Sequence, residues 1–418
     1  MQNPMPQSPW LSIADDSDFS IHNLPYGVFS TTRSRPRVGV AIGEQIINMA
    51  AVAARGKLHD LGIGPEVFEQ SSLNAFMHLG RPIWQKVRQR LQKWISEENS
   101  PLHQLREECL LPQSEARMHL PVQIGDYTDF YASEEHATNV GTMFRGEENA
   151  LMPNWKHMPI AYHGRASSIV ISGTEIHRPK GQLMPPDARQ PVFGPSEKLD
   201  FELEMAMVIG KDSQLGRPVS ISEAEEYIFG FLLFNDWSAR DIQKWEYVPL
   251  GPFLGKNFAS TTSPWIVPLE ALKAFQTQGP EQKPEPLAYL QQANPRNFDL
   301  KLVVSLQPEG EAAQTICRSN FKYLYWSVQQ MIAHHTINGC NLRVDDLLAS
   351  GTISGSAPDS YGSMLELSWN GEKPLRLNSG SRRTFVEDGD SIRMRAFAEK
   401  EGIRIGFGEV SNKILPTL

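Results

Sequence analysis

The stretch Leu199-Asp-Phe-Glu-Leu-Glu-Met-Ala-Met-Val-Ile209 alternates as a β-strand does, and it places acidic side chains on one face. Glu202 and Glu204 share their face with the apolar Ala206 and Val208, so they lie where a buried face begins. Two like charges side by side in partial burial are costly unless a cation or a base neutralises them. The stretch therefore predicts either a cation site or an ordinary solvated strand face, and its spacing alone favours neither.

Other segments of the chain share the strand pattern. An apolar run at residues 228–234 leads directly into Asn235-Asp236, and alternating segments occupy residues 391–398 and 404–414. Residues 37–42 and 45–49 predict a hairpin whose turn begins at Gly43. The counts of 31 Gly and 30 Pro favour many turns. We therefore predict a mainly β (α+β) protein whose larger part is a folded-over sheet or roll.

A helical pattern interrupts the strands after Pro82, with apolar residues on one face and Lys and Arg opposite. Residues 96–120 are polar and irregular in pattern. We predict that they connect a small N-terminal β domain, residues 1–118, to a larger C-terminal domain, residues 119–418. A second helix is predicted over residues 321–334, with Ser319 and Asn320 as capping candidates.

The stretch Asp129-Phe-Tyr-Ala-Ser-Glu-Glu-His136 holds a carboxylate, a phenol and an imidazole within eight positions. With Glu202, Glu204 and Asp236, its aspartate makes four carboxylates, and hard divalent cations prefer such oxygen ligands. His136 is the candidate general base, because imidazole titrates near neutral pH. A lone histidine more often has a structural role, and the acidic neighbours distinguish this one. The pattern indicates metal-assisted chemistry on an oxygen-rich small molecule.

The residues after Asp236 predict a ligand-binding helix face. If a helix begins at Trp237, then Arg240, Gln243 and Tyr247 share one side of it. A cation, an amide and a phenol in one row would bind an anionic, oxygen-bearing ligand. An ion pair between Asp236 and Arg240, with Tyr247 as a packing residue, explains the same spacing equally well.

Two further candidates rest on weaker signals. Lys256 lies in a loop bounded by Gly and Pro, where a lysine is usually only solvated. Glu366 interrupts the apolar strand pattern of Met364-Leu-Glu-Leu367, and a buried carboxylate of this kind usually has a partner. His334 and His335 lack acidic neighbours at ligand spacing, so we interpret them as structural.

Composition and charge narrow the class of protein. The net charge of −8 and the absence of basic runs argue against nucleic acid and anionic membranes as partners. No secretory signal or membrane-spanning stretch is visible, and three widely spaced cysteines favour a cytoplasmic location. The sequence has no G-x-S-x-G motif of a serine nucleophile and no H-E-x-x-H motif of a zinc protease. It also has no Walker A or G-x-G-x-x-G motif, and no organic cofactor is expected. A hydrolase built this way needs an activated water rather than a side-chain nucleophile.

Longer motifs occupy residues 18–30, 125–141, 162–168, 235–243, 245–256 and 349–356. Two of them read Asn235-Asp-Trp-Ser-Ala-Arg-Asp-Ile-Gln243 and Trp245-Glu-Tyr-Val-Pro-Leu-Gly-Pro-Phe-Leu-Gly-Lys256. Together they resemble the fumarylacetoacetate hydrolase family. The resemblance extends from about residue 15 to the C-terminus and is weakest at residues 55–118 and 268–300. Joined motifs of this length are specific to the full-length enzymes rather than to the wider superfamily.

The resemblance implies a small SH3-like N-terminal β-barrel, a larger mixed β-roll domain and a homodimer. It implies hydrolysis of the carbon–carbon bond of 4-fumarylacetoacetate to fumarate and acetoacetate, the last step of tyrosine and phenylalanine catabolism. It also implies Ca²⁺ or Mg²⁺ as the cation, which suits a reaction in which an enolate must leave.

The resemblance assigns each candidate residue a role. His136, oriented by Glu366, would activate the attacking water, while Arg240, Gln243 and Lys256 would stabilise developing negative charge. The implied metal ligands are Asp129, Glu202, Glu204 and Asp236. The implied substrate contacts are Tyr131, Arg145, Tyr162, Gln243, Tyr247 and Thr352. A second ion is implied near Lys256 and Ser260, where Ala-Ser replaces the more usual Gly-Thr.

Two other functions are compatible with the sequence. A superfamily member acting on acylpyruvates or other diketo acids, as a hydrolase or decarboxylase, would use the same carboxylate-bound cation. The pairing of His136 with Glu366 and the N-terminal domain argue against it. A non-catalytic binder of metal and organic acid would keep the pocket without turnover, but base, cation ligands and charge-stabilising donors are all present.

Overall fold

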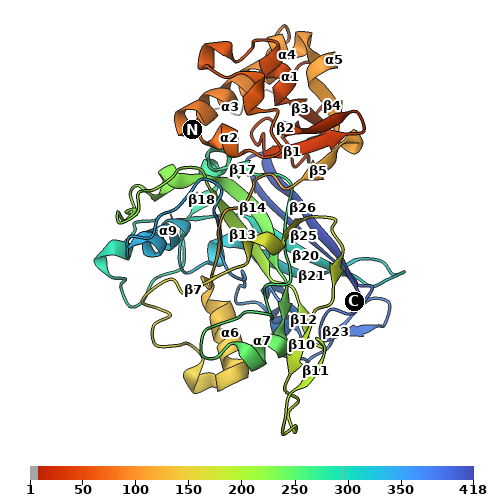
Figure 1. Ribbon diagram of the computed structural model, residues 1–418, viewed down its shortest axis with the longest axis vertical. Helices are drawn as coiled ribbons and strands as arrows, with labels where there is room; N and C mark the ends of the chain where they lie inside the picture. The colour runs from red at the N-terminus through yellow and green to blue at the C-terminus, as the bar shows by residue number, and fades with distance from the viewer. Residues whose placement is uncertain (1–7, 295) are drawn as a thin grey trace.

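The computed structural model describes residues 8–294 and 296–418, and it has a small N-terminal unit seated on a larger β-rich unit (Figure 1). The N-terminal sheet has five strands in the order β4-β3-β2-β1-β5. These strands are β1 (Tyr26–Thr31), β2 (Ser34–Ile42), β3 (Gln45–Asn48), β4 (Leu110–Pro112) and β5 (Arg117–His119). The helices of this unit are α1 (Met49–Ala54), α2 (Asn74–Met77), α3 (Arg81–Ser96), α4 (Pro101–Gln104) and α5 (Arg106–Cys109).

The predicted N-terminal hairpin and helix are both confirmed. Strands β2 and β3 pair antiparallel, and Gly43 begins their turn with a φ of +52°, a conformation that glycine adopts without strain. Helix α3 has Pro82 in its first turn. Residues 96–120 were expected to be irregular, but they form α4, α5 and the two edge strands β4 and β5. Elements of three or four residues are too short to show a periodicity.

The larger unit contains two main sheets. An eight-stranded sheet runs β7-β6-β22-β13-β14-β16-β8, with β17 also paired to β14. Its strands are β6 (Tyr127–Phe130), β7 (Ala161–His163), β8 (Ile169–Ile171), β13 (Leu203–Ile209), β14 (Ile228–Asp236), β16 (Ser260–Thr262), β17 (Val267–Pro268) and β22 (Leu347–Ala349). A five-stranded sheet runs β21-β20-β25-β26-β9. It contains β9 (Ile176–His177), β20 (Lys301–Gln307), β21 (Gln314–Asn320), β25 (Ser391–Lys400) and β26 (Ile403–Leu415).

Shorter elements complete the larger unit. The short strands are β10 (Lys180–Leu183), β11 (Val192–Pro195), β12 (Leu199–Asp200), β15 (Ser238–Ala239), β18 (Gln276–Thr277), β19 (Asn297–Phe298), β23 (Leu375–Arg376) and β24 (Arg382–Arg383). The helices are α6 (Glu134–Arg145), α7 (Arg240–Glu246), α8 (Leu269–Leu272), α9 (Val328–Thr336) and α10 (Met364–Leu367). No helix within the described ranges is long and apolar enough to cross a membrane. The mainly β architecture, with a small N-terminal β domain and a larger β domain, is confirmed.

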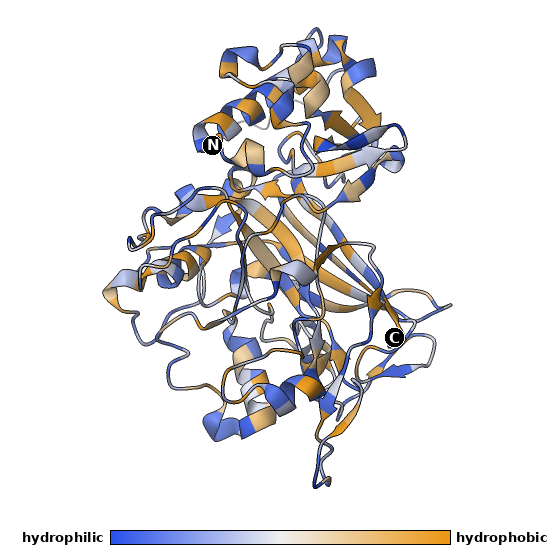
Figure 2. Cartoon of the chain, viewed as in Figure 1, coloured by the Kyte–Doolittle hydropathy of each residue, from blue (hydrophilic) through white to orange (hydrophobic). Residues whose placement is uncertain are grey.

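The opening stretch of sequence is buried on both of its faces. Leu203 and Met205 point into the main core of the larger unit, whereas Ala206 and Val208 point into a core shared with the N-terminal unit. The predicted alternation is therefore confirmed, and the solvated-face interpretation is wrong. The strand is also interrupted between β12 and β13, at Phe201 and Glu202. Figure 2 shows the apolar character of β13 and β14 at the centre of the molecule.

Three sequence-based boundaries need correction. The predicted helix at residues 321–334 is a short turn followed by α9, because Ser327 and Gln330 form a capping box at the later position. The helix expected from Trp237 begins instead at Arg240, after the two-residue strand β15. Glu366 lies in the helical turn α10 rather than in a strand, because Ser363 caps that turn.

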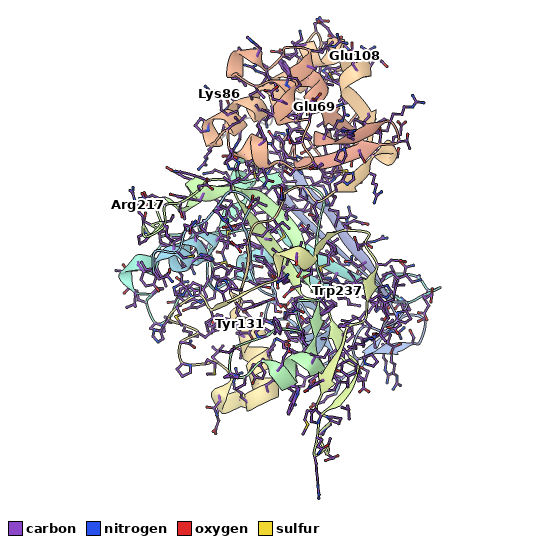
Figure 3. The ribbon with its side chains drawn as sticks, in the orientation of Figure 1. Glu69, Lys86, Glu108, Tyr131, Arg217 and Trp237 are labelled. Carbon is purple, nitrogen blue, oxygen red and sulfur yellow. The ribbon has the colours of Figure 1, made fainter. Side chains whose placement is uncertain are left out.

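The two units share an aromatic core at their junction. Phe229 of β14 packs against Tyr26, Phe76 and Trp84 of the N-terminal unit, with ring centroids 5.6, 6.2 and 4.9 Å away. Tyr26 also exchanges two backbone hydrogen bonds with Ile266. The charged Glu69, Lys86 and Glu108 belong to the N-terminal unit, whereas Tyr131 and Trp237 lie in the larger one (Figure 3). The junction is thus an apolar core and not a flexible link.

Replacing Phe229 with alanine is expected to lower the free energy of unfolding by about 3–5 kcal/mol, because the cavity would open between two packed units. Calorimetry should still show one transition, since both units lose the same core. Phe193→Ala is the control, because this side chain is 72% exposed and its loss should change stability by less than about 0.5 kcal/mol. Two separate transitions in the Phe229 variant would show that the units fold independently.

Candidate active site

Four carboxylates from neighbouring strands converge at one point of the larger unit. Asp129 lies on β6, Glu202 immediately precedes β13, Glu204 is its second residue, and Asp236 ends β14. Strand β22 pairs with both β6 and β13, and β13 pairs with β14, so the sheet brings the four residues together. One oxygen from each carboxylate lies within 4.8 Å of the others, and all four residues are buried.

The oxygens of this cluster fit a hard divalent cation. Asp129 Oδ1 and Glu204 Oε1 are buried and have no hydrogen-bond partner among the described residues. The other oxygens are occupied: the Tyr127 hydroxyl donates to Asp129 Oδ2 at 2.7 Å, and the Gly351 amide donates to Glu204 Oε2 at 3.0 Å. Gly351 has a φ of +75° at a position where a Cβ would meet Phe130 O, so glycine is required there. Unpaired, buried carboxylate oxygens are what a Ca²⁺ or Mg²⁺ ion would satisfy.

Burial and mutual repulsion disfavour the charged form of two of these carboxylates. Burial, and then the nearby charge of Asp236, raises the pKa of Asp129 well above its usual range. Burial, and then the charges of Asp129 and Glu202, does the same to the pKa of Glu204. A bound cation would favour the charged form of both carboxylates, so cation binding is expected to be linked to proton release.

Two buried cations neutralise the other half of the cluster. Lys256 Nζ donates to Glu202 and, at 3.0 Å, to Asp236 Oδ2. Arg240 Nη2 lies 2.7 Å from Glu202 Oε1. Burial opposes the charge on Glu202, yet Lys256 and Arg240 hold its pKa below the ordinary value. The alternative pairing of Asp236 with Arg240 is wrong, because the arginine binds Asp200 and Glu202 instead.

His136 stands beside the cluster in the first turn of α6. Its Nδ1 lies 2.7 Å from Glu366 Oε2, and its Nε2 lies 4.0 Å from Glu202 Oε1. Burial opposes the charge on Glu366, but His136 and several hydrogen bonds keep its pKa below the ordinary value. The donors to Glu366, besides His136, are Asn139 (3.0 Å), Ser354 (2.9 Å) and Ser363 (2.8 Å). A carboxylate held this firmly fixes the orientation of the imidazole ring.

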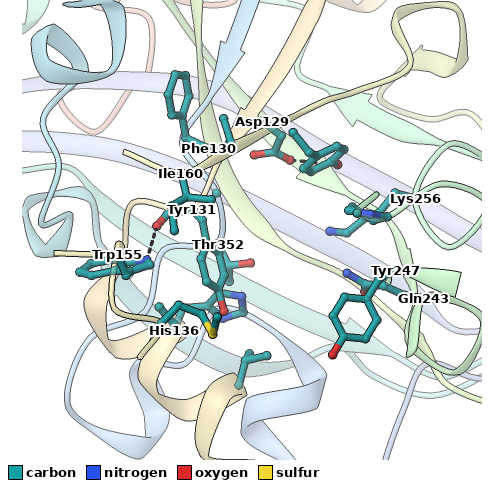
Figure 4. A pocket seen from close by; sticks show the side chains of 18 of the residues that line it. Asp129, Phe130, Tyr131, His136, Trp155, Ile160, Gln243, Tyr247, Lys256 and Thr352 are labelled. Atoms are coloured by element: carbon teal, nitrogen blue, oxygen red, sulfur yellow. Dashed lines mark hydrogen bonds between the residues drawn. The ribbon is translucent and has the colours of Figure 1, made fainter. Parts of the chain in front are cut away.

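Part of this arrangement lines a cavity of about 610 Å³. The predicted residues on its wall are Asp129, Tyr131, His136, Arg145, Tyr162, Glu202, Arg240, Gln243, Tyr247, Lys256 and Thr352. Figure 4 shows Tyr131, His136 and Thr352 on one side and Gln243, Tyr247 and Lys256 on the other. The rest of the wall is largely apolar and includes Val140, Phe144, Leu151, Trp155 and Ile160. The cavity therefore combines a charged end with an apolar wall, as small-molecule sites usually do.

The predicted residues that do not line the cavity are Glu204, Asp236, Ser260 and Glu366. Ser260 Oγ donates to Asp236 Oδ1 at 2.7 Å, next to Lys256. Because Lys256 Nζ is a donor to two carboxylates, ligation of a second ion by this residue would need another of its atoms, and that ion remains a prediction. Arg145 donates to the carbonyls of Asn149 and Ala150 at 3.1 and 2.7 Å. The Thr352 hydroxyl is buried and has no partner among the described residues.

Some residues of the site escaped the sequence-based prediction. Tyr127, Ser354 and Ser363 gave no signal, because single hydroxyls are common and their partners are distant in sequence. Asp200 did give a signal. It lies on the same predicted strand face as Glu202 and Glu204, and so extends the acidic face by one position. In the structure it is fully buried and binds Arg240.

The metal-free protein is expected to lose stability as the pH rises. The pKa values of Asp129 and Glu204 are raised in the folded state, so their contribution is complete below about pH 4 and is lost as the pH rises through the folded values. A bound cation removes this loss. Added Ca²⁺ should therefore raise the Tm more at pH 8 than at pH 5 in scanning calorimetry. Equal increases at both pH values would contradict the assignment of the cluster.

Two family models match the chain, one for each unit. The model "Fumarylacetoacetase N-terminal" matches residues 22–121, and the model "Fumarylacetoacetate (FAA) hydrolase C-terminal" matches residues 126–415. Human fumarylacetoacetase is 54% identical over 98% of this chain and 99% of its own length. The fumarylacetoacetase of Caenorhabditis elegans is 55% identical over 97% and 99%, and that of Arabidopsis thaliana is 52% identical over 98% and 98%.

Solved structures share the fold at much lower identity. A fumarylacetoacetate hydrolase from psychrophilic Exiguobacterium antarcticum aligns with a TM-score of 0.54 and 18% identity, covering 94% of this chain and 99% of that one. A maleylpyruvate hydrolase from Sphingobium aligns with a TM-score of 0.50 and 14% identity, covering 94% and 100%. The two family models together span most of the chain, and the long, high-identity matches agree with them. The chain belongs to the fumarylacetoacetate hydrolase family.

Proposed function

We propose that this chain hydrolyses the carbon–carbon bond of 4-fumarylacetoacetate to give fumarate and acetoacetate. The observation that carries the proposal is the position of His136, which lies between the buried carboxylate Glu366 and the acidic cluster, on the wall of one cavity. Base, cation ligands and donors for a developing negative charge face the same space. The family relationship supports this substrate.

His136 is proposed to act as the general base. If Nδ1 carries the proton and donates a hydrogen bond to Glu366, the lone pair of Nε2 faces the cavity. Nε2 would take a proton from a water as the water oxygen attacks one carbonyl carbon of the β-diketone. The adjacent carbon–carbon bond then breaks, its electron pair leaves as the enolate of the second product, and His136 returns the proton to the enolate carbon.

The charge that develops on oxygen would be stabilised by Arg240, Gln243 and Lys256. These donors are already held in place, because Arg240 Nη1 donates to Gln243 Oε1 at 3.2 Å and Lys256 bridges two carboxylates. A preorganised donor of this kind is worth roughly 3 kcal/mol in other enzymes. A Ca²⁺ or Mg²⁺ ion held by Asp129, Glu202, Glu204 and Asp236 would polarise the diketone oxygens when bound.

Substrate recognition is proposed for the cavity wall. Tyr131 and Tyr162 present phenols beside the charged end, and Thr352 presents a buried hydroxyl without a protein partner. Arg145 and Tyr247, also on the wall, would bind the carboxylates of the anionic diketo acid. The proposal also includes a second ion near Lys256 and Ser260, a homodimer and a cytoplasmic location; three free cysteines are compatible with a reducing compartment.

The test is direct turnover. The purified protein should remove the diketone absorbance of fumarylacetoacetate and release fumarate and acetoacetate in equal amounts. Acylpyruvates, assayed at the same concentrations, should have a kcat/KM at least about a hundredfold lower, since they lack the fumaryl arm that would contact the apolar wall. Faster turnover of an acylpyruvate than of fumarylacetoacetate would assign the chain to the alternative activity.

A further inference from the structure

Another buried carboxylate, Asp200, does not line the cavity and lies outside the acidic cluster. It is 0% exposed and belongs to β12, where it pairs in register with Ser238, two residues before Arg240. Its Oδ2 accepts a hydrogen bond from Arg240 Nε at 2.8 Å. The guanidinium is therefore held from behind by Asp200, while its Nη2 faces Glu202 across the cavity wall.

The same carboxylate also holds the turn that carries Glu366. Asp200 Oδ1 accepts from the Met364 amide at 2.6 Å, and Oδ2 accepts from the Leu365 amide at 3.1 Å. These two amides open α10, whose next residue is the partner of His136. Asp200 thus contacts both α10, which carries Glu366, and Arg240, which is proposed to stabilise developing negative charge.

Each arm has one other anchor: the guanidinium also lies 2.7 Å from Glu202 through Nη2, and α10 is also capped by Ser363. Arg240 Nε has no other acceptor among the described residues, and its Nη1 contact is to the neutral amide of Gln243 at 3.2 Å. A shift of about 1 Å in a charge-stabilising group costs roughly a hundredfold in rate in other enzymes. Without Asp200, the Arg240 guanidinium would move toward Glu202. It would then neutralise a carboxylate whose negative charge the acidic cluster needs to hold a cation.

We propose that Asp200 is a positioning residue that sets Arg240 and the His136–Glu366 pair in one fixed geometry. The inference rests on the proposed hydrolysis and adds to it a residue that contacts neither substrate nor cation. Asp200 acts through its two partners, so its loss should lower kcat and leave KM nearly unchanged.

The test is a kinetic double-mutant cycle. Asp200→Asn keeps Oδ1 for the Met364 amide but places an NH₂ group against two donors, Arg240 Nε and the Leu365 amide. We expect kcat for fumarylacetoacetate to fall roughly a hundredfold, with KM within threefold of the unmodified protein. In an Arg240→Ala background, the same substitution should lower kcat by a clearly smaller factor, since one of the two groups that it positions is gone and only the α10 arm remains.

A matched control separates positioning from stability. Asp390 is also buried and binds an arginine, with Arg383 Nε donating to Oδ2 at 2.8 Å and the Glu387 amide donating at 2.9 Å, and none of these residues lines the cavity. Asp390→Asn should lower the Tm as Asp200→Asn does while leaving kcat within twofold. If Asp200→Asn does not fold, the same cycle is run with Asp200→Glu, which keeps the charge and displaces it by one methylene.

Three results would overturn the inference: a kcat within threefold of the unmodified protein, an undiminished factor in the Arg240→Ala background, or an equal loss in Asp390→Asn. The proposed function fails separately, if the unmodified protein does not hydrolyse fumarylacetoacetate. Turnover by the unmodified protein together with normal kcat in Asp200→Asn would reject only the role of Asp200.

Discussion

Replacing His136 with alanine is expected to lower kcat for fumarylacetoacetate roughly a thousandfold while cation binding persists. The imidazole is the only group on the cavity wall, among the described residues, with a ring nitrogen held by a buried carboxylate on one side and open to the acidic cluster on the other. Its removal leaves the four carboxylates in place. Turnover and calorimetric titration with Ca²⁺, measured on the same preparation, separate the two effects.

The matched control for His136 is His334→Ala. His334 lies on α9, where its Nδ1 is 3.0 Å from the Tyr289 hydroxyl, and it does not line the cavity. This variant should retain kcat within twofold. If His136→Ala kept more than a tenth of the original kcat, another group would be the base. If it lost cation binding as well, the histidine would be a ligand rather than a base.

Replacing Glu204 with glutamine is expected to have opposite effects on the metal-free and the metal-bound protein. The amide removes a charge that burial and its acidic neighbours disfavour, so the metal-free protein should unfold at a higher temperature. The same change removes an unpaired anionic oxygen from the cluster, so cation affinity should fall more than about a hundredfold, beyond what groups that only orient ligands usually contribute. Turnover should fall with it.

Calorimetry with and without Ca²⁺ measures both the Tm of the metal-free protein and the cation affinity, and so checks that they change in opposite directions. The control is Glu226→Gln, an exposed carboxylate that pairs with Lys211 and should change neither the Tm nor the cation affinity. A lower Tm for metal-free Glu204→Gln would mean that the charge is stabilised by something other than a cation. Unchanged Ca²⁺ affinity would remove Glu204 from the ligand set.

The sequence predicted the elements with long, regular patterns. The strand at residues 228–234 and the tail strands are present as expected, since a seven-residue apolar run defines the first and long alternation defines the others. The burial of Glu202 and Glu204 follows from the apolar residues after them on the same face. The convergence of Asp129 with these residues depends on β22 lying between two strands, and no local pattern encodes that pairing.

Short elements and ion-pair partners could not be predicted as well. Glu366 sits in a helical turn of four residues, where a single Ser363 cap outweighs the apolar pattern. Arg240 binds Asp200 and not Asp236, because the helix begins three residues later than expected and β12 runs beside it. Such choices are decided by tertiary contacts, and the spacing along the chain leaves them open.

The central claim is that Asp129, Glu202, Glu204 and Asp236 together hold one divalent cation beside His136. The most direct measurement is anomalous diffraction from crystals of the protein grown with Mn²⁺, which replaces Ca²⁺ or Mg²⁺ at oxygen sites. The account predicts one strong peak about 2.0–2.6 Å from oxygens of these carboxylates. No peak in the cluster at saturating Mn²⁺ would contradict it.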